Sequence, residues 1–293
     1  MLSAVVVAYR NGCELLTCCE ALALAPEIEH IVVVDNSHHE GHPPLAGCSP
    51  ILASKLVQVL PNSNLGYAAG NNLGVLRASQ LGATLILVCN PDVIVRANAV
   101  AGLIGEIATF KLDLISPFLV EWDDDGLLHE LRSPGWDRAR GRGMIGTARD
   151  NTSAIVPTFF GACFVAKVEL FDRVGPLSED LFLYAEEIDY CMRMAERGDC
   201  RWQVSHRFSV DHARGTSISP GGSSLLTKSI VAYHHSARSA VIVGRKYWPH
   251  RVVGWTVLRA SLAAWLLVRG EVASAAAVAK GTRQGWTVHL TRE

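Results

Sequence analysis

The first third of the chain alternates short apolar runs with stretches of helical periodicity. Apolar residues recur at helical spacing in GCELLTCCEALAL and GYAAGNNLGVLRASQLG. The runs between them are AVVVAY (Ala4 to Tyr9), IVVVDNS (Ile31 to Ser37), KLVQVL (Lys55 to Leu60) and TLILVCNPD (Thr84 to Asp92). A strand buried on both faces is continuously apolar, and strands that alternate with helices form parallel sheets. The order predicts an α/β fold with a mostly parallel sheet, in which Leu85 to Cys89 is a central strand.

Polar side chains stand where three of these strands end. Tyr9 ends the first strand, Asp35 the second, and Asn90 and Asp92 follow the central one. Open α/β sheets bind ligands outside the carboxyl ends of their strands, so the sequence predicts a site at this edge. Each residue also has a structural alternative: an Asx turn for Asn90 and Asp92, a helix N-cap for Asp35, and packing for Tyr9.

Composition excludes several classes of function. The 27 basic and 28 acidic side chains nearly cancel, which argues against nucleic acid as a partner. A dinucleotide-binding dehydrogenase is disfavoured because AYRNGCE, rather than a Gly-x-Gly-x-x-Gly motif, follows the first strand. The eight cysteines have no zinc-site spacing and are interpreted as reduced cytoplasmic thiols. MLSAVVVAYR predicts a first strand rather than a signal peptide, and no apolar run reaches the ~18 residues of a membrane span.

The rest of the chain divides by pattern. LISPFLVEWDDDGLLHEL predicts a strand pair, whereas Arg132 to Ser153 is rich in Gly and Arg and predicts a mobile loop. The later elements are expected at Phe159 to Val165 (strand), near Leu181 (start of a helix), Trp202 to Val204 (strand) and from Ser229 onward (helices). We expect a catalytic domain at 1–228, with halves at about 1–113 and 114–228, and a helical extension at 229–293.

Taken in order, the motifs VVVAYRNG, VVVDNS, NPD, LYAEEIDYCMR and VDHARGTS resemble family 2 glycosyltransferases of the GT-A fold. The resemblance is to bacterial rhamnosyltransferase-like members that build surface polysaccharides, and it covers roughly residues 3 to 250. NSNLGYAAGNNLG, which contains Asn64 and Gly66, matches a further family stretch between the second and third motifs. The resemblance implies a GT-A type, Rossmann-like sheet flanked by helices.

It also implies roles for the residues at the strand ends. Asp35 would hydrogen-bond a uracil or thymine ring, with Tyr9 near that base. Asp92 would hold Mg²⁺ or Mn²⁺ at the donor's diphosphate, while Asn90 stands where many relatives carry the first carboxylate of an Asp-x-Asp motif. His212 would complete the metal site, since histidine is a common metal ligand. The alternative is a surface or buried histidine that is bonded to backbone. Asn64 and Gly66 join this donor-binding set.

The acidic cluster AEEIDYCMR carries the catalytic prediction. Inverting transfer needs a base that removes the proton of the acceptor hydroxyl. In the family's Glu-Asp-x-Asp pattern, Glu186 and Asp189 match, and Glu187 occupies the position of the base. On a helix, Glu186 and Asp189 share one face and Glu187 points about 100° away, so only part of the cluster can line one site. A solvated helix start is the structural alternative.

The resulting expectation is an inverting, metal-dependent glycosyltransferase that uses a UDP- or dTDP-sugar. It would add rhamnose or a similar hexose to a saccharide or a lipid-linked saccharide. The alternative is a catalytically silent nucleotide-sugar-binding protein. Acceptor recognition is expected in Leu127 to Ser153 and after Ser219. Arg214 and the Gly-Thr-Ser that follows it are expected to donate hydrogen bonds to phosphate.

The tail from Arg245 to Trp286 mixes tryptophans with basic residues. Leu258, Leu262, Trp265 and Leu266 fall on one side of a predicted helix. A basic, Trp-bearing amphipathic helix can lie in a bilayer interface, which predicts a cytoplasmic protein attached peripherally to the inner membrane. The same face could instead pack on the catalytic domain or form a homodimer.

Overall fold

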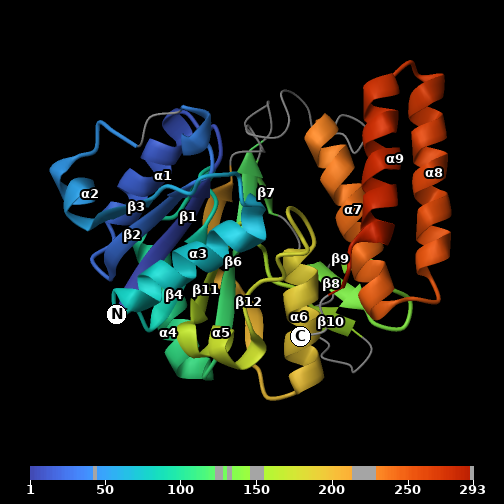
Figure 1. Cartoon of the computed structure of the whole chain (residues 1–293). Helices are drawn as coiled ribbons and strands as arrows, with labels where there is room; N and C mark the ends of the chain where they lie inside the picture. Colours follow the sequence, from blue (N-terminus) through green and yellow to red (C-terminus); the bar gives the residue numbers. More distant parts are fainter. Residues whose placement is uncertain (42–44, 123–127, 131–133, 146–154, 213–228, 291–293) are drawn as a thin grey trace.

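The computed structural model describes residues 1–41, 45–122, 128–130, 134–145, 155–212 and 229–290 (Figure 1). Its centre is a nine-stranded sheet with the order β3-β2-β1-β4-β11-β6-β12-β5, and β7 pairs with β6 beside this path. Helices cover both faces of the sheet, and the three helices formed by the described residues after 229 stand together at one end of the molecule (Figure 1).

The N-terminal half supplies the parallel part of the sheet. Its elements are β1 (Leu2–Ala8), α1 (Cys13–Ala23), β2 (Ile28–Asp35), η1 (His38–Glu40), α2 (Pro50–Lys55), β3 (Leu56–Val59), α3 (Gly66–Gln80), β4 (Leu85–Cys89), β5 (Val93–Ile94) and α4 (Ala97–Phe110). The four predicted strands form, and β1 pairs in parallel with both β2 and β4. β4 lies inside the sheet, between β1 and β11, as its apolar run predicted.

The C-terminal half mixes strand directions. Its elements are β6 (Leu114–Trp122), β7 (Leu128–Glu130), β8 (Pro134–Asp137), β9 (Arg142–Ile145), β10 (Ile155–Pro157), β11 (Cys163–Lys167), α5 (Val168–Val174), α6 (Glu186–Arg197), β12 (Trp202–His212), α7 (Ile230–Tyr247), α8 (Val252–Val268) and α9 (Val272–Thr287). β11 runs antiparallel to both β4 and β6, whereas β6 and β12 are parallel. The predicted pairing of β6 with β7 is confirmed.

Two sequence expectations are wrong. Part of the predicted loop, Arg132 to Ser153, forms the β8–β9 hairpin, which pairs with β10 in a small second sheet. The Trp136 ring packs 5.7 Å from the Trp248 ring, so this hairpin rests on the helical end. The helix expected near Leu181 begins only at Glu186. Tyr184 and Ala185 before it have positive φ angles of 74° and 71°, which no helix continues through.

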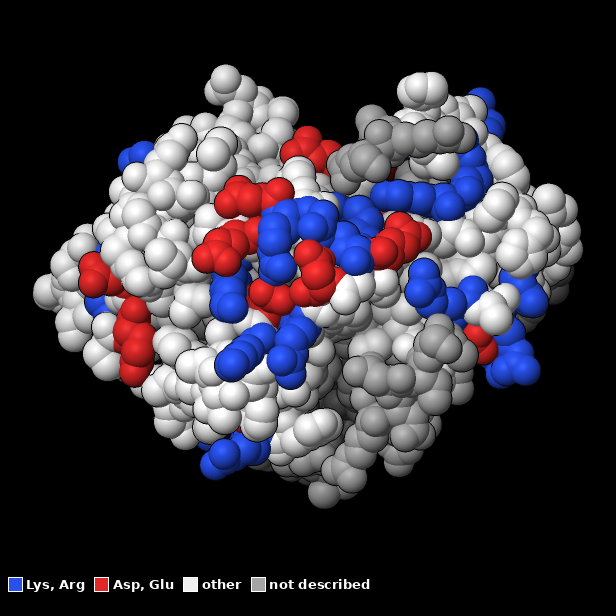
Figure 2. All heavy atoms as spheres, turned by 90° about the horizontal axis from the view of Figure 1, so that it is seen from below, with Lys and Arg blue, Asp and Glu red and all other residues white. Residues whose placement is uncertain are grey.

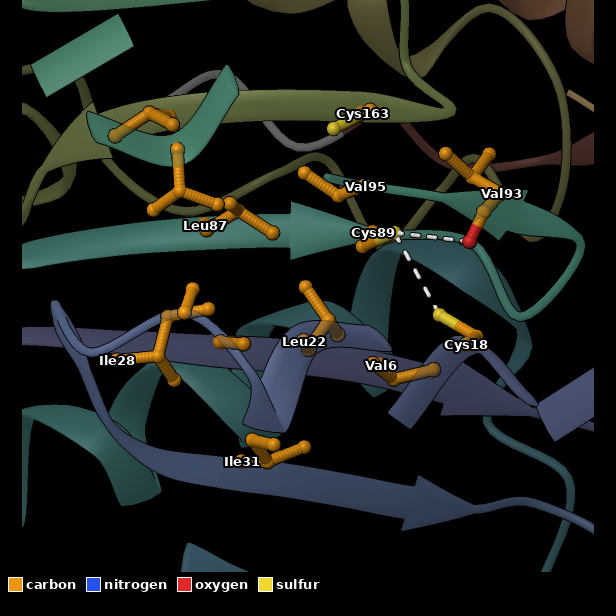
Figure 3. Close-up of a cluster of buried hydrophobic side chains, with 14 of the residues drawn as sticks. Val6, Cys18, Leu22, Ile28, Ile31, Leu87, Cys89, Val93, Val95 and Cys163 are labelled. Atoms are coloured by element: carbon orange, nitrogen blue, oxygen red, sulfur yellow. Dashed lines mark hydrogen bonds between the residues drawn. The ribbon is translucent and has the colours of Figure 1, made fainter. Parts of the chain in front are cut away.

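The core lies on both faces of the sheet. Along β1, Ala4 and Val6 face one apolar cluster, beneath α1 and α4, while Val5 faces the other, beneath α3 and α6. Burial on both sides explains the unbroken apolar runs of the sequence. Figure 3 shows part of the first cluster at the end of β4, where the Cys18 and Cys89 sulfur atoms lie 3.8 Å apart.

The helical end begins with α7. Ser229 begins α7, and its hydroxyl accepts the Ala232 N–H at 3.1 Å, a side-chain N-cap. α9 packs so closely on α7 that a Cβ at Gly281 would overlap the His234 carbonyl oxygen. In the part of the chain that the structure describes, no helix has both the length and the apolarity that membrane crossing requires.

Candidate active site

The predicted polar residues gather at one edge of the sheet. Ala8 of β1 is in register with Asp35 of β2, and Val6 of β1 with Cys89 of β4. Because these three strands are parallel, their carboxyl ends lie side by side. Tyr9, Asp35 and the Asn90 to Asp92 segment therefore share this edge, which lies away from the chain's N-terminus in Figure 1.

Asn-Pro-Asp forms a tight turn between β4 and β5. The Val93 N–H donates to the Asn90 carbonyl at 3.1 Å, which closes a β-turn with proline in its second position. The Asn90 N–H donates to the Ala162 carbonyl at 2.8 Å, and the Cys18 thiol approaches the Asn90 carbonyl at 3.5 Å. The turn reverses the chain at the sheet edge, which explains why apolar residues resume directly after it. Asn90 enters these bonds through its backbone.

Asp92 lies beside His212 and Glu121. β5 pairs with the end of β12, so that Val93 opposes His212, and β12 runs beside β6, which ends close to Glu121. The His212 Nε2 atom lies 3.8 Å from Asp92 Oδ2, longer than a hydrogen bond, and His212 Nδ1 lies 3.0 Å from Glu121 Oε1. An ionised carboxylate only accepts, so Nδ1 donates to Glu121 and the Nε2 atom faces Asp92. Glu121 was not anticipated from the sequence.

This pair suits a divalent ion. Asp92 Oδ1 is buried without a hydrogen-bond partner among the described residues, and burial raises the Asp92 pKa against the lowering effect of His212. A buried carboxylate oxygen without a partner is costly unless a cation or water completes it. Carboxylate and imidazole are ligands that Mn²⁺ accepts. Among the described residues no three His, Cys, Asp or Glu side chains cluster in a metal-binding arrangement, and Asp92 and His212 are the two candidate ligands in that part of the chain.

Asp35 and Tyr9 hold the segment that follows β2, which contains η1, in place. Asp35 Oδ1 accepts the Ser37 N–H at 2.9 Å and the Ser37 hydroxyl at 2.6 Å, which is the Asx-turn geometry that precedes η1. The Tyr9 hydroxyl donates to Glu40 at 3.1 Å, and Arg10 forms an ion pair with the same carboxylate at 2.7 Å. Asp35 therefore forms an Asx turn with Ser37 rather than the helix N-cap that was its structural alternative, and Tyr9 is exposed at the edge.

Asn64 and Gly66 shape the start of α3. The Asn64 side chain accepts the Gly66 N–H at 2.9 Å, and the buried Asn36 amide donates to the Gly66 carbonyl at 3.0 Å. Gly66 has φ = 79°, and a Cβ there would lie 2.5 Å from the Phe182 carbonyl oxygen. That carbonyl also accepts the Tyr67 N–H at 2.7 Å. The start of α3 thus connects the second strand end to the segment before α6.

Glu187 lies at the start of α6, close to the segment that precedes β11. A Cβ added to Gly161 would be 3.8 Å from both the Glu187 Oε2 atom and the Tyr67 hydroxyl, which donates to the Gly161 carbonyl. Burial raises the pKa of Glu187, and burial followed by the nearby Glu187 charge raises that of Glu186. Burial and these two carboxylates raise the pKa of the Tyr67 phenol. The Asn90 N–H bonds to the adjacent Ala162 carbonyl, so this acidic region adjoins the Asn-Pro-Asp turn.

Asp189 has a different environment. Its Oδ2 accepts the Arg193 guanidinium at 2.9 Å, and its Oδ1 accepts Lys246 at 2.7 Å and the Tyr247 hydroxyl at 2.8 Å. The side chain is 1% exposed, so both oxygens are engaged in joining α6 to α7. The structure brings Glu187 toward Tyr67, while Asp189 is bound on the α7 side.

The remaining predictions for this region fall outside the described residues. They concern Arg214 with the Gly-Thr-Ser after it, and the first part, 220–228, of the region that follows Ser219. The other predicted acceptor segment, Leu127 to Ser153, is described only at 128–130 and in the 134–145 hairpin.

Comparison with known proteins gives relatives of one kind. No protein-family model matches the chain. It is 25% identical over 200 residues to the low-salt glycan biosynthesis hexosyltransferase Agl10 of Haloferax volcanii, covering 62% of this chain and 64% of that protein. It is 24% identical over 301 residues to the N-acetylglucosaminyl-diphospho-decaprenol L-rhamnosyltransferase of Mycobacterium tuberculosis, covering 93% and 94% of the two chains.

A solved structure supports the fold. The crystal structure of GalNAc-T7 with UDP, GalNAc and Mn²⁺ matches with a TM-score of 0.54 at 14% identity, over 72% of this chain and 43% of that one. The predicted resemblance to glycosyltransferases and the GT-A type fold are confirmed. The chain spans less than two thirds of the length of the Haloferax relative.

Proposed function

Because its curated relatives are glycosyltransferases and its fold is of the GT-A type, we propose that this chain is an inverting glycosyltransferase. It transfers a sugar from a UDP- or dTDP-sugar to a saccharide or lipid-linked saccharide. One observation carries the proposal: the Asp92 and His212 pair and the Glu187 carboxylate adjoin the same turn at the carboxyl edge of the sheet. A donor site and a base are thereby neighbours.

The donor half comprises about residues 1–113 of a catalytic domain that we assign to 1–228. Asp35 and Tyr9 stand at adjacent strand ends, where a nucleotide base would lie. Asn64 and Gly66 border the same region through Asn36. Asp35 keeps Oδ1 bonded to Ser37, so Oδ2 is the oxygen that we assign to the uracil or thymine ring.

Asp92 and His212 would hold Mg²⁺ or Mn²⁺, with Asn90 in the turn beside them. Such an ion neutralises the charge that develops on the diphosphate leaving group. Glu121 holds the His212 ring through Nδ1, which fixes the orientation of Nε2 toward Asp92. The proposal is supported by the buried Asp92 Oδ1, which no described residue satisfies.

Glu187 is the proposed base, with Glu186 beside it. The acceptor hydroxyl gives its proton to the Glu187 carboxylate while its oxygen attacks the anomeric carbon. The bond from that carbon to the diphosphate oxygen breaks, and the nucleoside diphosphate leaves with the electron pair. Burial raises the Glu187 pKa, which makes the carboxylate a stronger base than one in water. Asp189, bound by two cations, is assigned to joining α6 and α7 instead.

Donor and acceptor follow from the relatives' names. The mycobacterial relative is named for L-rhamnose and for N-acetylglucosaminyl-diphospho-decaprenol, and the Haloferax relative for hexose transfer in glycan biosynthesis. We assign this chain to rhamnose or a similar hexose, to a lipid-linked acceptor and to surface polysaccharide synthesis at the cytoplasmic face of the membrane. In this assignment the helical extension, 229–293, is the part of the chain that contacts the membrane.

The test combines donor binding with transfer. A thermal-shift screen of nucleotide sugars with Mn²⁺ identifies the donor, because a ligand of the native state raises the melting temperature. With that donor, Glu187→Gln should lower transfer by ~10²-fold or more and leave donor binding close to wild type. Glu169→Gln, at the equivalent second position of α5 and exposed, is the matched control.

The metal assignment is tested in the same way. Asp92→Ala and His212→Ala should each remove the Mn²⁺-dependent stabilisation by UDP or dTDP, while His206→Ala, exposed on the same strand, should keep it. Unchanged Mn²⁺-dependent binding in both site variants would contradict the shared site. Donor binding without transfer to any acceptor would favour the catalytically silent nucleotide-sugar-binding protein.

A further inference from the structure

Helix α8 is apolar on two sides, and the described residues cover only one of them. Leu266 is fully buried, and Leu262 packs with it against side chains of α7 and α9. The sequence placed Leu258, Leu262, Trp265 and Leu266 on one face, but the structure divides them. Leu258 is 66% exposed, and Trp265 is also exposed on the outer side.

The outer side of α8 is largely apolar. It forms the far edge of the helical end, with α9 between it and α7 (Figure 1). Its large exposed side chains are Val253, Val257, Leu258, Trp265, Leu267 and Val268. Arg259 is the only charged residue in Val252–Val268, and it is partly buried. A helix that is apolar all round is normally buried on all sides. The outer α8 face is exposed instead, which marks it as a surface that contacts a further apolar partner.

The helical end is strongly basic. Residues 229–290 contain eight Lys or Arg against one Glu, in a chain whose net charge is −1. Figure 2 shows the underside, where acidic and basic side chains intermingle in the middle, while Lys and Arg predominate over the helical end at the right. A region with a large excess of basic side chains attracts an anionic surface and opposes the approach of a second copy of itself.

Basic and aromatic side chains also border the outer α8 face. Arg251 precedes α8 and Arg269 follows it, with the Arg269 guanidinium 4.6 Å from the Trp265 ring centre. Trp286 of α9 is exposed and bonds to Thr256 of α8 at 3.1 Å. Arginine and tryptophan at the margin of an apolar helix are the side chains that suit the headgroup layer of a bilayer.

We propose that the outer α8 face lies in the interface of a membrane that contains anionic lipid. The helix lies in the plane of the surface, because its 17 residues extend only about 25 Å, short of the ~30 Å hydrocarbon core. Its valines and leucines enter the upper acyl region, while Arg251 and Arg269 meet lipid phosphates. This attachment needs no sugar donor, so it is separable from the proposed transfer activity.

The experiment is flotation of the full chain with vesicles, without donor or acceptor. Vesicles of phosphatidylcholine with roughly a quarter phosphatidylglycerol should carry the protein upward at low salt, and pure phosphatidylcholine much less. Val257→Glu with Leu258→Glu should lower the partition coefficient at least tenfold, because two charges enter the apolar face. Ile51→Glu with Leu76→Glu, the same change at exposed apolar positions of α2 and α3, should float like wild type.

A second pair of variants tests the charge. Arg251→Gln with Arg269→Gln should lose roughly fivefold per residue on the anionic vesicles and show a weaker salt dependence. If the double glutamate variant melts early, Val268→Glu replaces it, since that side chain is 88% exposed.

Three outcomes would overturn the inference. They are wild-type protein that does not float on anionic vesicles, a glutamate variant that floats equally well, and a solution dimer that the glutamate variant splits while neither protein floats. The last result would assign the outer α8 face to a second copy.

Discussion

Replacing Asp189 by asparagine separates structure from chemistry in the acidic cluster. The side chain is 1% exposed and accepts bonds from Arg193, Lys246 and Tyr247 at 2.7 to 2.9 Å. Asparagine has the same shape, but it carries no charge, and its amide nitrogen cannot accept a hydrogen bond. Arg193 and Lys246 would then be cations without their carboxylate.

The cost follows from the burial of this group. Removing one partner of a buried ion pair typically costs ~3–5 kcal/mol. Arg193 keeps its bonds to the Val174 and Pro176 carbonyls, and Lys246 is 23% exposed, so water partly compensates it. We therefore expect about 3 kcal/mol. For a domain of this size, roughly 2–4 °C per kcal/mol gives a fall of about 6–12 °C in the melting temperature.

The assay compares thermal unfolding with transfer in the same preparations. Asp189→Asn should melt early, yet retain donor binding and transfer well below its melting temperature. Glu187→Gln should lose transfer but keep its melting temperature, because burial already disfavours the charged form of Glu187. Asp199→Asn, which removes an exposed partner of Arg197, is the control and should leave the melting temperature unchanged. Lost transfer in Asp189→Asn without a change in melting temperature would refute the structural assignment.

Two further predictions follow from the same site. Glu121→Ala should weaken Mn²⁺ binding in the presence of UDP by about 10–100-fold, and ¹⁵N NMR should show that His212 loses its single Nδ1–H tautomer. Glu121→Gln, whose side-chain oxygen still accepts the His212 hydrogen bond, should stay near wild type. Equal Mn²⁺ affinity and the same His212 tautomer in both variants would refute this role of Glu121. Glu186→Gln should be more stable than wild type at pH 8, because the raised pKa of Glu186 means that folding favours its protonated form. Wild-type stability falls as pH rises from about 4.5 through that raised pKa, so denaturant titrations should show the advantage vanish below about pH 4.5; an advantage that does not change with pH would contradict it.

The sequence alone was sufficient for the parallel half of the sheet. A strand buried on both faces must be apolar throughout, and that requirement is local, so Leu85–Cys89 could be placed between its neighbours without knowing their contacts. The polar residues at the ends of β1, β2 and β4 had to share an edge because parallel strands end together. The fold class and much of the candidate site therefore follow from short segments.

Elements that depend on distant contacts could not be predicted in this way. The β8–β9 hairpin has a Gly- and Arg-rich sequence, and it is held by β10 and by packing of Trp136 on Trp248. The late start of α6 depends on α7, whose Arg238 and Ser239 side chains bind the carbonyls of the segment before it.

Glu121 carries no local signal, since a single glutamate near a strand end is common. Only the parallel register of β6 with β12 brings it to His212. For α8, too, the local sequence does not specify the contacts of its side chains. Its sequence established that the helix is apolar, but an apolar residue does not specify its partner. The packing of α7 and α9 decided that Leu262 and Leu266 are covered and that Leu258 and Trp265 face outward, because three helices in a row cover only one side of the outermost helix.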